Sequence, residues 1–403
     1  MEMIELLELA LKRNASDLII TANSPPILRI NGDVIQTELD KLSPKDTKSL
    51  INEILDEEQK QIFARRKELD FSYEIPKLSR FRVNVYLQKG TIAATIRPIP
   101  LHVPDLYTLN LPPAVEELAF RPRGLILVTG PAGSGKSTTL AAMIDLINRK
   151  RKCHIITIED PIEYLHENKL SVIEQRELHV DTESFASALK HVVRQSPDVI
   201  MVGEMRDLET ISTAITAAET GHLVLGTLHT IDATQSIHRI VDVFPPSQQS
   251  QIRIQFAGAL QGIIAQQLLP KANKTGRIPA VEILISTPAI RNLIVNNDIH
   301  QIPLLIHTGK DVGMKTLNQS LRELYRKKLI TYETAISCAT NLNEFKRLIR
   351  SDLEKYKKRK GLRTIRFLKI VFKGKVSLLF KIRKYILAFY KKAASSGKFW
   401  GYS

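Results

Sequence analysis

The sequence predicts an α/β protein of two domains, the larger of which contains a mostly parallel sheet with helices on its faces. Three observations support this fold class. A phosphate-loop pattern lies between an apolar, strand-like run and an apolar, helix-like run at 124–147. From Ala114 onward, short apolar runs alternate with helix-like stretches. A proline-punctuated segment at 99–113 separates this region from residues 1–98.

Residues 1–98 have the pattern of a small α/β domain. The expected elements are a helix at 1–14, strands at 17–21 and 27–30, an Asn31-Gly32 hairpin turn, helices at 43–55 and 57–66, and strands at 70–74, 79–87 and 91–97. In the strand at 79–87, Phe81, Val83, Val85 and Leu87 alternate with Arg80, Arg82, Asn84 and Tyr86. Arg80, Arg82 and Arg97 could therefore share one surface, which could equally be a solvated sheet face.

The larger domain, 114–350, is expected to contain a sheet whose ligand lies at the carboxyl ends of its strands. The expected strands are 124–129, 154–159, 171–174, 199–202 and 222–227. The residues that directly follow each strand are therefore the candidates for a functional site.

The stretch after the first of these strands fits the phosphate-loop pattern. It reads Gly130, Pro131, Ala132, Gly133, Ser134, Gly135, Lys136, Ser137 and Thr138. Its glycines let backbone N–H groups turn toward phosphate oxygens, and the following helix N-terminus favours an anion. Lys136 is expected to reach the β- and γ-phosphates, and the Ser137 hydroxyl is expected to ligate Mg²⁺. The sequence therefore predicts a site for ATP and Mg²⁺.

Acidic and histidine side chains follow three other strands. Glu159, Asp160 and Glu163 suit the handling of metal-bound water near phosphate, or they form an acidic helix start. Glu204 follows the apolar run 199–202 and could act as the general base for water. His229 follows the fifth strand and could donate to a γ-phosphate, although a lone histidine is often structural.

Together these segments resemble the secretion-type ATPases, and most closely the type IV pilus retraction (twitching motility) ATPases of the PilT family. The motifs that carry the likeness are Ser16-Asp17-Leu18, Pro25–Gly32, Arg80–Asn84, the phosphate loop, Ile158–Glu163, Val202–Asp207, Thr220–Thr230 and Ala289–Ile294. The likeness covers about residues 3–345. It implies a homohexamer that hydrolyses ATP to disassemble pili, with a PAS-like N-terminal domain and a RecA-like motor domain in each subunit.

The resemblance also implies roles for individual residues. Glu204 would activate the attacking water. Glu159 and Glu163, together with His222 and His229, would surround the γ-phosphate. Arg80, Arg82 and Arg97 match positions from which basic side chains reach the nucleotide when the two domains close.

Two departures from the family pattern bear on function. Ile19 stands where the family usually has a histidine, and Val295-Asn296 stands where it commonly has Arg-Glu. The second departure concerns the coupling of hydrolysis to retraction more than hydrolysis itself. The only cysteines, Cys153 and Cys338, cannot form the tetracysteine zinc site usual in pilus extension ATPases. The alternatives are an accessory partner of another retraction ATPase and a type II/IV secretion-type assembly ATPase.

The net charge of +16 comes entirely from residues 355–403, within the C-terminal extension 351–403, which lies outside the resemblance. Residues 355–403 contain 16 Lys and Arg and no acidic residue. This basic, aromatic composition favours an anionic membrane surface, with an acidic protein or a nucleic-acid backbone as alternatives. No signal peptide and no membrane-spanning apolar run is expected. The expected location is the cytoplasm, at the inner membrane, with the platform protein of the pilus machine as partner and no nucleic acid.

Overall fold

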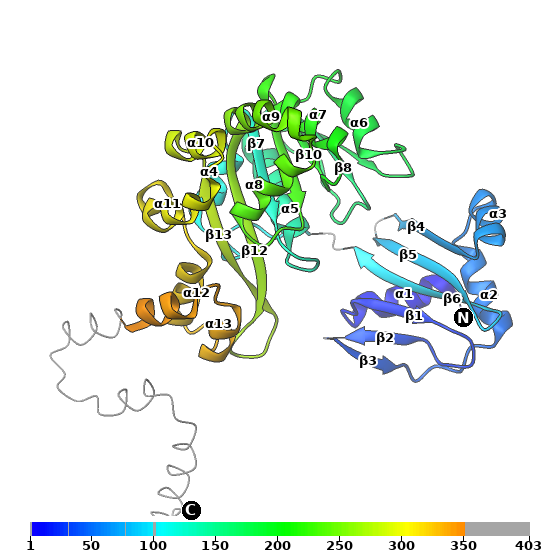
Figure 1. The fold of residues 1–403 in the computed structure, drawn as a ribbon. Coiled ribbons are helices and arrows are strands. Elements are labelled where there is room, and N and C mark those ends of the chain that lie inside the picture. Colours follow the sequence, from blue (N-terminus) through cyan, green and yellow to red (C-terminus); the bar gives the residue numbers. More distant parts are fainter. Residues whose placement is uncertain (1, 31, 77, 100–101, 351–403) are drawn as a thin grey trace, which may run out of the picture. The chain divides into compact units, whose positions relative to one another are not determined.

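The computed structural model describes residues 2–30, 32–76, 78–99 and 102–350. Internal contacts group 1–341 into one compact unit and 342–403 into a second. The contact boundary therefore falls after Asn341, nine residues before the point at which the sequence places the start of the basic extension. Residues 351–403, on which the membrane prediction depends, lie outside the described residues. Figure 1 traces the chain.

Residues 17–99 form a six-stranded antiparallel sheet in the order β3-β2-β1-β6-β5-β4. Its strands are β1 (Asp17–Ile20), β2 (Ile27–Ile30), β3 (Asp33–Gln36), β4 (Glu68–Ile75), β5 (Ser79–Gln88) and β6 (Thr91–Ile99). Its helices are α1 (Met3–Lys12), α2 (Pro44–Glu53) and α3 (Glu57–Arg66). Reciprocal side-chain caps at Ser43 and Asp56 explain why α2 and α3 begin where they do.

Two details of this sheet differ from the sequence-based expectation. Leu87 is 39% exposed, although Phe81, Val83 and Val85 on the same face of β5 are buried. Leu87 lies near the end of the strand, where the hydrophobic core no longer covers it. In addition, β6 continues through Pro98 to Ile99. β5 pairs with it over this whole length, whereas β1 pairs with it only as far as Ile96. Pro98 therefore has a strand neighbour on one side only, which is where a sheet tolerates proline.

Residues 124–285 contribute a seven-stranded sheet in the order β13-β12-β7-β11-β10-β8-β9. Every neighbouring pair is parallel except β12 and β13. The strands are β7 (Gly124–Thr129), β8 (His154–Glu159), β9 (Val172–Glu177), β10 (Val199–Val202), β11 (Leu223–Leu228), β12 (Leu260–Pro270) and β13 (Arg277–Ile285). The α/β prediction is confirmed, but the pair β12–β13 was not among the expected strands.

Helices cover both faces of this sheet (Figure 1). The helices that follow residue 112 are α4 (Pro113–Ala119), α5 (Lys136–Lys150), α6 (Phe185–Val192), α7 (Leu208–Glu219), α8 (Ala233–Asp242), α9 (Pro246–Ala259), α10 (Pro288–Val295), α11 (Ile302–Thr308), α12 (Leu317–Arg326) and α13 (Tyr332–Cys338), with 3₁₀ turns at Ile299–Gln301 and Gly309–Val312. No helix among the residues that the structure describes is both long and apolar enough to cross a bilayer.

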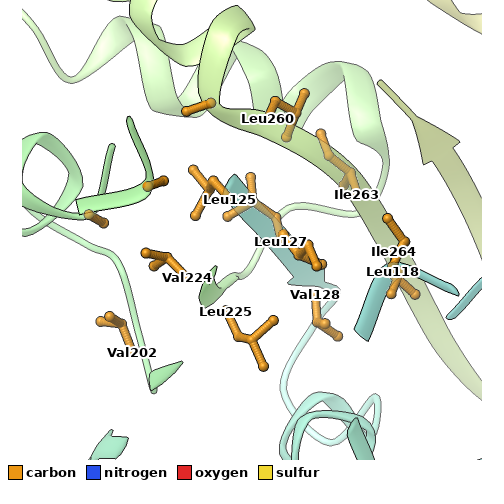
Figure 2. Close-up of a cluster of buried hydrophobic side chains, with 14 of the residues drawn as sticks. Leu118, Leu125, Leu127, Val128, Val202, Val224, Leu225, Leu260, Ile263 and Ile264 are labelled. Carbon is orange, nitrogen blue, oxygen red and sulfur yellow. The ribbon is translucent and has the colours of Figure 1, made fainter. Parts of the chain in front are cut away.

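The core of the seven-stranded sheet lies around β7. All residues of β7, β10 and β11 are buried, which explains their uninterrupted apolar sequences. Figure 2 shows side chains of β7 beside those of β11 and β12. Val103, Leu106 and Leu111, which precede α4, belong to this cluster or pack against it. The segment 99–113, which is expected to link the two sheets, is therefore anchored to the larger core over much of its length.

Candidate active site

The phosphate loop connects the end of β7 to the start of α5, as its sequence predicts. Three of its residues, Gly130, Gly133 and Gly135, have positive φ angles of 143°, 72° and 89°. At Gly130 a Cβ atom would lie 2.2 Å from the carbonyl oxygen of Gln266, so no larger residue fits there. The loop is thus held in close contact with the neighbouring strand β12.

Lys136 is the first residue of α5 and is 9% exposed. Its Nζ donates to the carbonyl oxygens of Gly130, at 2.8 Å, and Pro131, at 3.2 Å. Burial lowers the pKa of this ammonium group, and the carboxylates of Glu204 and Glu163 partly oppose that shift. The side chain therefore folds back over the loop with two carboxylates close enough to influence its charge.

A cavity of about 430 Å³ opens over the loop. Its lining brings together many of the residues expected at the site: Ala132, Gly133, Ser134, Gly135, Lys136, Ser137, Thr138, Glu159, Glu163, Glu204, His229 and Arg97. Most of these residues follow the carboxyl ends of β7, β8, β10 and β11, at the edge where an open parallel sheet binds its ligand. The cavity is polar and large enough to hold phosphate groups beside Lys136.

Glu204 and His229 contact each other beside the phosphate loop. The Nε2 atom of His229 lies 2.9 Å from Glu204 Oε1, and Arg206 donates to the same oxygen. The two residues meet because β10 and β11 are parallel neighbours, with Val202 opposite Gly226. The glutamate is 18% exposed, so its carboxylate lies in a partly screened position facing the cavity.

Glu159 is the most deeply buried carboxyl group of the cavity. Burial raises its pKa to about 7, although hydrogen bonds from Thr157, at 2.7 Å, and Gln175, at 3.0 Å, favour the charged form. Glu163, by contrast, is exposed at the cavity wall. Glu159 therefore exchanges a proton near neutral pH, close to the phosphate loop.

Ser137 and Thr138 present hydroxyl groups to the cavity, and the Thr138 hydroxyl hydrogen-bonds the Tyr164 hydroxyl at 3.0 Å. No cluster of three or more His, Cys, Asp or Glu that could hold a metal by itself occurs within the described residues. A metal at Ser137 would thus need oxygens from phosphate or water to complete its coordination, as is usual for Mg²⁺ beside nucleotides.

The three predicted arginines lie in different surroundings. Arg97 lines the cavity and donates from Nε and Nη2 to Asp17 Oδ1, at 2.9 and 2.8 Å. Arg80 instead pairs with Glu177, with 2.7 Å between Nη2 and Oε2. Arg82 is exposed, and no partner for it is found among the described residues.

Arg80 and Arg82 therefore do not line this cavity, and their reach to the nucleotide on domain closure stays a prediction. Glu177 is 3% exposed and also accepts a hydrogen bond from Ser72 at 2.7 Å. A buried carboxylate of this kind attracts the nearest guanidinium group strongly, which accounts for the position of Arg80.

His222 does not belong to the cavity of its own chain. It directly precedes β11, whereas His229 follows the same strand, so the two lie at opposite ends of a strand about 20 Å long. The ring of His222 contacts the carbonyl oxygen of Ala217 at 2.9 Å. The expected place of His222 beside the γ-phosphate is thus not found in this chain, because the phosphate loop lies at the carboxyl end of the sheet.

The sequence reasoning missed cavity residues that come from β12 and β13. Leu268 and Arg277 line the cavity, and Gln266 contacts the phosphate loop from below. A signal was available: the apolar runs at 263–265 and 278–285 flank the turn-rich stretch 271–276, a pattern that predicts a hairpin.

The parallel sheet, the phosphate loop after β7 and the Glu204–His229 pair together define an ATPase of the P-loop class with a RecA-like fold. More particularly, the chain belongs to the family described as type II/IV secretion system protein, whose model matches residues 5–302.

Relatives and solved structures extend this match over most of the chain. The chain is 47% identical over 335 residues to the type IV pilus retractation ATPase PilT of Pseudomonas aeruginosa, covering 83% of this chain and 97% of that protein. It is 48% identical over 316 residues to a twitching motility protein of Neisseria gonorrhoeae, covering 78% of this chain and 84% of that protein. A crystal structure of the pilus retraction motor PilT with bound ADP matches with a TM-score of 0.81 and 48% identity, covering 86% of this chain and 99% of that one.

Proposed function

We propose that this ATPase powers the retraction of type IV pili. The observation that carries the proposal is the cavity in which Lys136, Glu204 and His229 meet over the phosphate loop. The identity of 47% to a retraction ATPase, over nearly all of that protein's length, supports retraction of pili over their extension.

The geometry suggests a division of roles at the cavity. Backbone N–H groups of the phosphate loop and Lys136 would bind the phosphates of ATP. Glu204 would accept a proton from the attacking water, while His229, 2.9 Å away, would orient that carboxylate and donate to the γ-phosphate. Glu159 and Glu163 would hold water on the other side of the phosphate chain.

A magnesium ion is the second cofactor that we propose. Ser137 lines the same cavity as Glu159 and Glu204, whose carboxylates would order water around the ion. This oxygen-rich donor set suits Mg²⁺, which keeps several waters and takes phosphate oxygens as ligands. When bound, the ion would neutralise charge on the β- and γ-phosphates.

Arg97 would contribute a further positive charge, since it already lines the cavity. Arg80 and Arg82 would contribute only after a rearrangement in which Arg80 leaves Glu177. Such a rearrangement fits the proposed homohexamer of two-domain subunits, in which hydrolysis changes the domain arrangement of each subunit in turn. The two separate hydrophobic cores support this two-domain organisation.

We further propose that the protein works in the cytoplasm against the inner membrane, where its partner would be the platform protein of the pilus machine. Residues 355–403, with 16 basic residues and no acidic one, would contribute affinity for anionic lipid. Full-length protein should sediment with vesicles containing anionic lipid, and protein lacking 355–403 should not. Continued sedimentation of the shortened protein would contradict the lipid role.

The number of surface pili in a strain that lacks this protein tests the proposal directly. Retraction predicts more pili than in the parent strain, together with loss of twitching. A bald surface would instead indicate a pilus or secretion-type assembly ATPase. An unchanged number, with another ATPase still retracting pili, would indicate the accessory role that Val295-Asn296 leaves open.

A further inference from the structure

Gln266 lies in β12 at the point where the neighbouring strand β7 turns into the phosphate loop. The register pairs Ala265 with Thr129, the last residue of β7, so Gln266 lies beside the first residue of the loop. Its side chain is 2% exposed. An uncharged amide so deeply buried must satisfy its donor and acceptor within the protein.

Both ends of this amide contact the phosphate-binding segment. Gln266 Nε2 donates to the carbonyl oxygen of Ser134 at 2.8 Å, and Gln266 Oε1 accepts from the Thr139 hydroxyl at 2.8 Å. The orientation of the amide follows from chemistry, because a backbone carbonyl oxygen can only accept a hydrogen bond. One side chain therefore ties the apex of the loop to the first turn of α5.

The contact with Ser134 determines which way the next peptide group faces. In a trans peptide the C=O and the following N–H point in opposite directions. A Ser134 carbonyl held toward β12 thus turns the Gly135 N–H away from β12, toward the side on which a phosphate would bind. Close packing reinforces this arrangement, since a Cβ atom at Gly135 would lie 2.8 Å from Gln266 Nε2.

We propose that Gln266 is a positioning residue that holds the phosphate loop in the conformation that binds nucleotide. The inference rests on the proposed binding of ATP at this cavity and adds to it the residue that orients the loop from below. Gln266 touches neither the Glu204–His229 pair nor the space above Lys136, so it acts on the affinity for the phosphates and not on the chemical step.

The test compares one chemical change at two adjacent residues. Gln266→Glu keeps the size of the side chain and can still accept from Thr139, but it places a carboxylate oxygen against the Ser134 carbonyl. Gln267→Glu is the matched control, since Gln267 is partly exposed and its side chain lies on the opposite face of the strand. Each full-length protein is titrated with a fluorescent ATP analogue and Mg²⁺, and KM, kcat and the melting temperature without nucleotide are measured.

The Gln266→Glu protein should bind the analogue about ten- to a hundredfold more weakly than the wild-type protein, as expected when a buried acceptor loses its donor. KM for ATP should rise in parallel, and kcat at saturating ATP should change by less than about threefold, because the catalytic geometry is retained. Gln267→Glu should match the wild type. A Kd unchanged in Gln266→Glu, or a loss confined to kcat, would overturn the proposal.

A second variant keeps the test decisive if Gln266→Glu does not fold. Thr139→Val removes only the hydroxyl that donates to Gln266 Oε1 and should weaken binding about three- to tenfold. A Thr139→Val protein with wild-type affinity for the analogue would count against the positioning role of Gln266. A wild-type protein that binds no ATP at all would instead refute the proposed function, so the two failures are distinguishable.

Discussion

Glu282 provides a test of the electrostatics beside the loop 229–233. It lies in β13, and its Oε1 accepts a hydrogen bond from the Ala233 N–H at 2.9 Å, at the start of α8. The chain between His229 and Ala233 forms the loop that begins at His229, for which we propose a catalytic role. Burial raises the pKa of Glu282 to about 7, although hydrogen bonds from the backbone of Ala233 and Leu317 favour the ionised form.

The raised pKa makes stability depend on pH in a defined direction. The folded protein holds this proton more tightly than the unfolded chain, whose glutamates titrate near 4.5. The contribution to stability is therefore fully present below pH 4.5 and is lost as the pH rises through about 7. The interval from 4.5 to about 7 corresponds to about 3 kcal/mol, at about 1.4 kcal/mol for each pKa unit.

Glu282→Gln removes the titrating group and keeps an oxygen that can accept from Ala233. We expect the free energy of unfolding of the wild-type protein, relative to this variant, to fall by about 3 kcal/mol between pH 4.5 and pH 8. Urea unfolding at a series of pH values measures this difference, and Glu117→Gln, at an exposed residue of α4, is the control. Parallel pH profiles for the wild-type and Glu282→Gln proteins would refute the reasoning.

Three further predictions concern the cavity itself. Lys136→Ala should weaken ATP binding by about a hundredfold or more, since it removes a charged donor to phosphate; near wild-type affinity in a binding titration would contradict this role. Glu204→Gln should bind ATP normally but turn over about 10²- to 10⁴-fold more slowly, and wild-type phosphate release would exclude Glu204 as the base. In Glu159→Gln, the change of kcat/KM with pH near 7 should disappear, since Glu159 has a pKa of about 7; an unaltered pH profile would assign that change to another group.

The parts of the fold that the sequence predicts well are those determined by neighbouring residues. The strand 124–129, the glycine loop and the helix after it have the expected order, because apolar burial, positive φ at glycine and helix initiation are all local properties. The clustering of Glu159, Glu204 and His229 was also predictable. Parallel strands bring the residues that follow them to one edge of the sheet.

The parts that the sequence does not predict depend on contacts between distant residues. Gln266 reaches Ser134 across 132 positions, and no local pattern distinguishes it from Gln267. The strand β12 was missed because it begins at Leu260, immediately after the last residue of α9, so no turn separates the helix from the strand. The pairing of Arg80 with Glu177 was equally hidden. The alternating sequence of β5 is the same whether Arg80 faces solvent or pairs with a distant carboxylate.

The anchoring of the segment before α4 sets a mechanical limit on the molecule. Val103 and Leu106 already pack against the larger core, so only four peptide steps separate Ile99, the last residue of β6, from the first anchored side chain. Four steps of trans peptide span at most about 14 Å. The segment that joins the N-terminal sheet to the larger core is therefore short. While Val103 stays packed on the core, the end of β6 can lie no farther than about 14 Å from it, whatever the angle between the two sheets.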